Sequence, residues 1–277
     1  MFEFMKNTPL YPLFLRLRTR RFAEDRLRTQ LMKRGHSLDK QNTENLPGGI
    51  FLFEVEVLLR EWTRRGLPAD ETVRWVWGLV YKARFREGFQ APQAAATAPA
   101  NLDEVAKPIQ SRRSVRKWTS EPVGTEEIQA AVDAAQWAPS SCNRQPWHFL
   151  ALSSQEDIDF MTRFTAQSFF RRAPLVLAAL VDTTVYGADE THFAYLDLGA
   201  AIQNLLLTLH AEGLGACWLG VKHKSGFDEN AEAFRRRFDL EARYKLVSFI
   251  AVGHPAGHPP APPRKPLEAI LRTIRQE

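Results

Sequence analysis

Apolar positions recur at helical spacing in the first part of the chain. In residues 51–65 and 71–86 they lie three or four positions apart, which predicts two amphipathic helices. Gly66 ends the first helix and Asp70 is placed to cap the second. Two such helices cannot close a core alone, so we expect their aromatic side chains to pack against the rest of the protein. The side chains concerned are Trp62, Trp75, Trp77, Tyr81 and Phe85.

Three flanking segments complete the expected organisation. Residues 10–34 are expected to be helical after Pro12, and residues 35–49 have the composition of a polar loop. Residues 90–100 are rich in Ala and Pro, which is typical of a linker. The pattern therefore predicts a helical appendage over residues 1–89, a linker over 90–100 and a main domain over 101–277.

Helical and strand patterns alternate in the main domain, which predicts an α+β fold with one mixed sheet flanked by helices. Thr125 is expected to cap one helix, and the helix at 191–212 is apolar on nearly every face. That helix is expected either in the domain centre or in a subunit interface. Helices are predicted at 103–110, 125–137, 155–167, 191–212 and 228–238, and strands at 148–152, 174–181, 216–219 and 244–252.

Two polar stretches have no obvious role in a core. Residues 138–147 read A-P-S-S-C-N-R-Q-P-W between a predicted helix and a predicted strand, where binding groups are often found. Residues 111–116 read S-R-R-S-V-R. Guanidinium groups and hydroxyls suit a phosphate, although a solvated basic helix end is the alternative interpretation.

With these two stretches in this order, the chain resembles the FMN-dependent nitroreductase family. Two further patterns agree with this family: residues 197–220 look like its central helix and following strand, and residues 252–267 look like its last strand and closing P-R-K-P-L. The resemblance covers roughly residues 103–275. It implies a nitroreductase-like mixed sheet and a homodimer that binds FMN between subunits.

The resemblance also implies which residues bind FMN. Arg112, Ser114 and Arg264, with Arg113, would lie near the phosphate and ribityl chain, and Arg116 near the pyrimidine edge. From the partner chain, the flavin would be reached by Pro139, Ser140, Ser141 and Asn143. Backbone N–H groups along the ring would come from Trp218, Leu219 and Gly220. We find no adenine-binding fingerprint, so FMN is expected rather than FAD.

Composition and charge exclude several classes of protein. The net charge of +5 comes from the first 100 residues, which hold 17 Lys and Arg against 11 Asp and Glu. A basic helix could lie on a membrane or on nucleic acid, but a solvated face packed on the main domain is the favoured interpretation. The two cysteines lie far apart and suggest neither a metal site nor a disulfide framework. No signal peptide or spanning segment is evident, so a cytoplasmic location without stable membrane insertion is expected.

The expected activity is an NAD(P)H-dependent oxidoreductase in which hydride passes through the flavin to a small oxidant, nitroaromatics and quinones being usual for the family. No catalytic triad and no metal ligand set is found, as expected when the cofactor carries the chemistry. Residues 182–190 are too short for the helical lid that the family usually has, and we expect the appendage to replace it. The alternative is that the appendage packs on a remote face and stabilises the dimer. Two alternatives stay open: a flavin oxidase acting on a peptide or tailoring intermediate, and a non-catalytic flavin-binding or docking protein.

Overall fold

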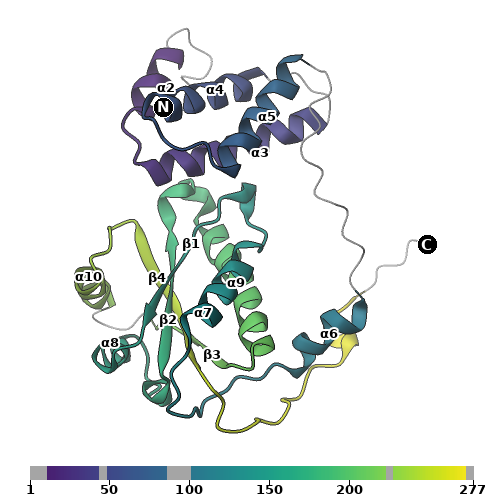
Figure 1. Ribbon diagram of the computed structural model, residues 1–277, viewed down its shortest axis with the longest axis vertical. Coiled ribbons are helices and arrows are strands. Elements are labelled where there is room, and N and C mark those ends of the chain that lie inside the picture. Colours follow the sequence, from purple (N-terminus) through teal and green to yellow (C-terminus); the bar gives the residue numbers. More distant parts are fainter. Residues whose placement is uncertain (1–10, 44–48, 86–100, 223–226, 273–277) are drawn as a thin grey trace.

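The computed structural model describes residues 11–43, 49–85, 101–222 and 227–272. Figure 1 shows two parts: a group of helices at one end of the molecule and a sheet domain below it. The predicted linker, residues 90–100, lies outside the described residues. The appendage contains α2 (Tyr11–Thr19), α3 (Glu24–Thr43), α4 (Gly49–Arg64) and α5 (Glu71–Phe85).

The predictions for α4 and α5 are confirmed. Gly66 follows α4 with a positive φ of 66°, and the Val73 N–H donates to the Asp70 carboxylate at 3.0 Å, which caps α5. The prediction of one helix over residues 10–34 is wrong, because α2 ends at Thr19 and a separate helix, α3, begins at Glu24.

The predicted polar loop over residues 35–49 is also wrong, since α3 continues to Thr43. The reason is packing that the sequence pattern does not reveal. A Cβ at Gly35 would lie 2.8 Å from the Trp75 ring and 2.9 Å from Val76, so a glycine allows α3 to approach α5 closely. Leu38 of the same segment is fully buried. Tertiary burial therefore outweighs the polar composition.

The appendage closes a core of its own, contrary to the expectation that its aromatic residues bury against the main domain. Trp62 is 1% exposed within this core and Trp75 packs against it. Trp77 and Tyr81 are about half exposed. The side chain of Phe85 lies outside the described residues.

The sheet domain confirms the predicted order of helices and strands. Its four-stranded sheet has the order β1–β2–β4–β3, with antiparallel pairing between these strands and a parallel bridge from Ser114 to Ala216 beside β3. The strands are β1 (Trp147–Leu152), β2 (Leu175–Asp182), β3 (Gly215–Gly220) and β4 (Tyr244–Gly253). The helices are α6 (Leu102–Ser111), α7 (Thr125–Gln136), α8 (Gln155–Phe160), α9 (Thr191–Ala211) and α10 (Phe227–Arg237), with short 3-10 helices η1 (Ser141–Asn143), η2 (Met161–Phe164), η3 (Phe169–Arg172), η4 (Thr183–Val185), η5 (Ala188–Glu190) and η6 (Leu267–Ala269).

One apolar core lies on each side of this sheet. The first contains α7 and α9, and the second contains Phe164, Phe170 and Phe234. The α+β fold class is confirmed. Two details differ: Gly124 rather than Thr125 precedes α7 as its N-cap, and the helix predicted at 155–167 ends at Phe160 and continues as η2.

The segment between β2 and α9 contains only the 3-10 helices η4 and η5, as its length predicts. The α3 helix of the appendage contacts η4 here and also η1. An ion pair of 2.5 Å joins Asp25 of α3 to Arg243 of the sheet domain. Across all described residues, we find no helix with the length and apolar character needed to cross a bilayer.

Candidate functional site

A cluster of basic side chains forms where α6 ends beside the last turn of α9. Arg112 follows α6 directly, and the Ser111 hydroxyl lies 2.7 Å from Nε2 of His210 on α9. A pocket of about 120 Å³ is lined by Arg112, Arg113, His210 and His258, among others. Such a group of cations and hydroxyls matches the donors that bind a phosphate.

One donor of this cluster is buried and unpaired within the described residues. The Nε of Arg112 is buried and has no hydrogen-bond partner among the described residues. Burial lowers the pKa of His210, and the neighbouring Arg112 and Arg113 lower it further. A buried donor without a partner costs free energy, and a group that accepts hydrogen bonds at this position would remove that cost.

The edge strand β3 extends from this cluster along the sheet. The Val115 N–H donates to the Ala216 carbonyl at 3.0 Å, which fixes the arginine stretch beside β3. Further along, Trp218 is 44% exposed and Gly220 is exposed, whereas the Leu219 side chain is buried. Leu219 can therefore offer only its backbone to a ligand. Arg116 is exposed, and its guanidinium lies 5.8 Å from the Phe169 ring centroid.

The second predicted stretch forms a tight loop around η1. Cys142, Asn143 and Gln145 have positive φ values of 52°, 51° and 46°, which non-glycine residues seldom adopt. The Ser141 N–H donates to Asp197 of α9 at 2.9 Å, and the Gln145 N–H donates to the Ser140 hydroxyl at 3.0 Å. Strained backbone held by such bonds is characteristic of functional loops. Pro139, at the start of this loop, is exposed.

Within one chain the two motifs lie at opposite ends of α9. Ser141 bonds Asp197 and Ser111 bonds His210, and these two positions on α9 are separated by about 20 Å at 1.5 Å per residue. Figure 1 shows α6 at the end of α9 that is far from the appendage. The structure therefore brings together Arg112, Arg113, Ser114, Arg116 and β3, but not the loop. Arg264 is exposed and does not line the pocket of the arginine cluster.

Comparison with known proteins identifies the family. The model of the nitroreductase family matches residues 109–165 and 159–254, which include both motifs, α9 and β3. A protein of Methanothermobacter thermautotrophicus, described as a putative NADH dehydrogenase/NAD(P)H nitroreductase, is 31% identical over 157 residues, which are 56% of this chain and 80% of that protein. The chain belongs to the nitroreductase family.

Two further proteins that resemble this chain have related descriptions. An FMN reductase [NAD(P)H] of Bacillus subtilis is 25% identical over 61% of this chain and 73% of its own length. The crystal structure of a putative nitroreductase from Desulfovibrio desulfuricans in complex with FMN is 30% identical. It covers 65% of this chain and all of that chain, with a TM-score of 0.54. The family model does not extend into the appendage.

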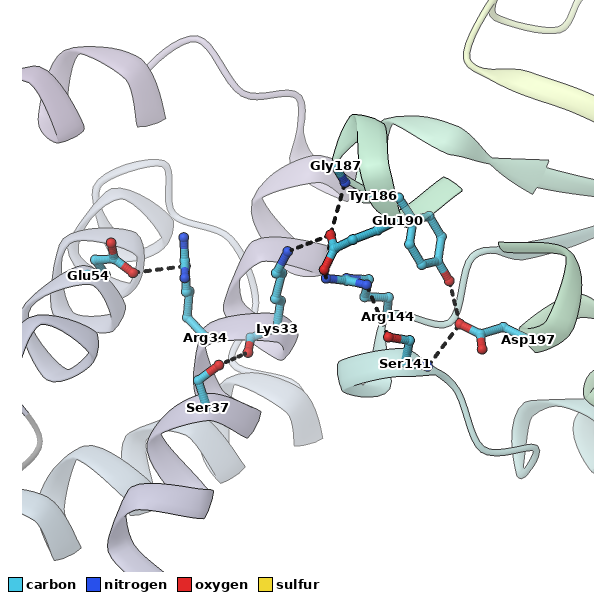
Figure 2. Close-up of polar contacts among 10 residues, drawn as sticks. All are labelled: Lys33, Arg34, Ser37, Glu54, Ser141, Arg144, Tyr186, Gly187, Glu190 and Asp197. Atoms are coloured by element: carbon cyan, nitrogen blue, oxygen red, sulfur yellow. Dashed lines mark hydrogen bonds and ion pairs between the residues drawn. The ribbon is translucent and has the colours of Figure 1, made fainter. Parts of the chain in front are cut away.

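An ion-pair network holds the loop around η1 in place (Figure 2). The sequence analysis did not predict this network. Arg144 is 1% exposed, and its guanidinium donates to both carboxylate oxygens of Glu190 at 2.9 Å. Glu190 also accepts from the Gly187 N–H at 3.0 Å and pairs with Lys33 of the appendage at 3.4 Å. Arg144 lies within the polar stretch of residues 138–147, and this position was the only indication of its role in the sequence. Its partners lie far away in the sequence.

This network has a defined ionisation state. Burial alone would raise the pKa of Glu190, but the bonds from Gly187 and Arg144 and the charge of Lys33 outweigh it and hold the pKa at about 2. Nearby, burial and then the bond to Asp197 strongly raise the pKa of the Tyr186 hydroxyl. Glu190 is therefore a carboxylate at neutral pH and links the appendage to the loop.

Proposed function

We infer that the protein is an NAD(P)H-dependent flavin oxidoreductase of the nitroreductase type, with FMN as its cofactor. The observation that carries this inference is the buried Nε of Arg112, which has no hydrogen-bond partner among the residues that the structure describes and lies in a basic pocket beside an edge strand. Membership of the nitroreductase family supports the enzyme class, and the relatives described as an FMN reductase and as an FMN complex support the cofactor.

The residues of this chain fit FMN at two places. Arg112, Arg113 and Ser114 would hold its phosphate, to which Ser111 and His210 add a further polar pair. Those backbone N–H groups of residues 218–220 that point away from β4 would face the ring, because an edge strand has one side that the sheet does not use. Arg116 would place a cation at the pyrimidine edge and favour negative charge there. When bound, FMN supplies the hydride chemistry between NAD(P)H and an oxidant.

We propose that the FMN site is shared between two chains of a homodimer. One chain separates its two motifs along α9, so a second copy would bring Pro139, Ser140, Ser141 and Asn143 to the arginine cluster. Exposed apolar side chains support such an interface, since groups of them mark association surfaces. They include Leu102, Val105 and Ile109 of α6, Tyr195 and Leu196 of α9, and Trp137 after α7.

Nitroaromatic and quinone oxidants are the proposed substrates in vitro, and the proposed location is the cytoplasm. Arg264 stays a predicted phosphate ligand. The direct test is the absorption spectrum of the purified protein. We expect an oxidised-flavin spectrum that NAD(P)H bleaches and a quinone restores, and mass analysis should identify the released cofactor as FMN. Release of FAD, or flavin that neither nicotinamide reduces, would contradict the proposal.

The appendage is proposed to replace the missing lid. Its α3 helix packs on η1, and Lys33 pairs with Glu190 beneath the same loop. If this loop reaches the partner's flavin, α3 stands next to that site. The appendage would then limit which oxidants enter.

A shortened chain that begins at Asn101 tests the lid. We expect it to retain FMN and the dimer, while KM for bulky oxidants changes several-fold and KM for small quinones changes little. Lys33→Met in the full chain is the matched variant, because it keeps the appendage and removes its pairing with Glu190. Unchanged kinetic constants for every oxidant in the shortened chain would show that the appendage is not a lid.

A further inference from the structure

A cavity of about 470 Å³ lies in the seam between the appendage and the sheet domain. Helices α2, α3 and α4 form its appendage side, and residues 184–187 with Glu190 form its other side. Its size is within the range of small-molecule sites. None of its lining residues is among those assigned to FMN above.

The cavity is lined by more cations than carboxylates. Arg18, Arg26, Lys33 and Arg34 face it together with Glu54 and Glu190. Both carboxylates are already engaged. Glu54 pairs with Arg34 at 2.9 Å and accepts from the Tyr11 hydroxyl, and Glu190 is held by Arg144 and Gly187. The lining therefore has an excess of positive charge within a partly enclosed space.

Among the cations of this lining, Arg26 has a buried donor that an anion could satisfy. Its Nε is buried without a hydrogen-bond partner in the described part of the chain, and its guanidinium lies 4.7 Å from the Phe22 ring centroid. Burial lowers the pKa of Arg18, with Arg26 as the next cause, and burial followed by Arg144 lowers the pKa of Lys33. An anion in the cavity would accept a hydrogen bond from the buried Nε of Arg26 and would offset the unfavourable burial of the neighbouring cations.

The remaining walls indicate what else the ligand carries. Leu15, Phe22, Leu58 and Val185 contribute apolar surface to the same cavity. A bare inorganic anion would leave this surface unused, whereas a small organic phosphate would cover it. Arginine groups bind phosphate oxygens in pairs, which favours a phosphate over a single carboxylate.

We propose that this seam cavity binds a small organic phosphate, its phosphate held by Arg26 with Arg18 and Lys33 and its organic part on the apolar wall. The ligand would contact both parts of the protein at once. It therefore stabilises the docked position of the appendage by mass action. Through Lys33, Glu190 and Arg144 this position is linked to the loop around η1.

Calorimetric titration of the full chain, with FMN bound at the flavin site and unbound FMN removed by gel filtration, tests the proposal. The probes are AMP, inorganic phosphate and adenosine. We expect AMP to bind more tightly than phosphate and adenosine not to bind. Arg26→Gln should weaken AMP binding about tenfold or more, whereas Arg16→Gln, which removes an exposed cation of α2 outside the cavity, should change it less than about twofold.

Gln30→Glu provides a second variant should Arg26→Gln fail to fold, because it places a negative charge in the cavity lining without removing a cation. It should weaken AMP binding to a similar degree. Competition with NADP+ distinguishes the source: displacement of AMP points to the nicotinamide dinucleotide phosphate, and no displacement to a separate phosphate ester. The proposal is overturned if AMP binds more weakly than about 1 mM, if adenosine binds equally well, or if Arg26→Gln and Arg16→Gln behave alike.

Discussion

Arg112→Gln should weaken FMN binding by about 10- to 100-fold, the loss expected when a charged donor to phosphate is removed. The buried Nε of Arg112 has no hydrogen-bond partner in the described part of the chain, so we expect its role to depend on the ligand more than on the fold. Glutamine keeps a polar side chain and removes the cation. Flavin fluorescence during dilution of the purified protein measures the dissociation constant.

Arg172→Gln is the matched control, because Arg172 is an exposed cation in the same domain and lies outside the pocket of Arg112. It should leave the FMN affinity within about twofold. Thermal unfolding of both apoproteins establishes that the fold is intact. Equal FMN affinity in Arg112→Gln and the original protein would show that Arg112 does not bind the FMN phosphate.

Glu190→Gln should lower the free energy of unfolding by about 2 to 3 kcal/mol, the range for hydrogen bonds to charged groups. The fully buried Arg144 then keeps its charge and loses its carboxylate partner. Chemical denaturation measures the change. Glu232→Gln, which breaks the solvent-accessible pairs with Arg235 and Arg236 on α10, should lower the free energy of unfolding much less. Similar losses in both variants would mean that the Arg144 pair is no more important than a surface contact.

The lowered pKa of Glu190 predicts that the stability of the protein depends on pH in the acid range. Because the pKa of Glu190 is lowered from 4.5 to about 2, its contribution to stability is complete above about pH 4.5 and is lost as the pH falls towards 2. We expect Glu190→Gln to reduce the steepness of the stability loss in this window. An unchanged acid profile in the variant would assign that loss to other carboxylates.

The family and its cofactor were predictable because the candidate site residues stand in two short segments. The arginine stretch and the polar loop carry their chemistry locally, so motif order was sufficient to identify the family, the fold class, the enzyme class and FMN. The strands were predictable for a similar reason, since each is a short apolar run. The individual flavin contacts, the dimer and the extent of the domains stay predictions.

The rest depended on contacts between distant segments. Residues 35–43 look like a loop but form a helix because Gly35 meets Trp75 across the appendage. Lys33 and Glu190 are separated by 157 positions, and neither has a local pattern that indicates the other. The seam cavity likewise forms only when α2, α3 and α4 meet the segment before α9.

Mixing two defective variants tests the shared FMN site most directly. Arg112→Gln impairs the phosphate cluster, and Ser141→Trp is designed to block the loop. If one site uses both chains, a mixed dimer contains one intact site and one site with both defects. Random exchange should then restore FMN binding and NAD(P)H–quinone turnover to about a quarter of the original level, since half of the dimers are mixed and each has one working site. No recovery in an exchanged mixture, with mixed dimers demonstrated by mass, would contradict the shared site.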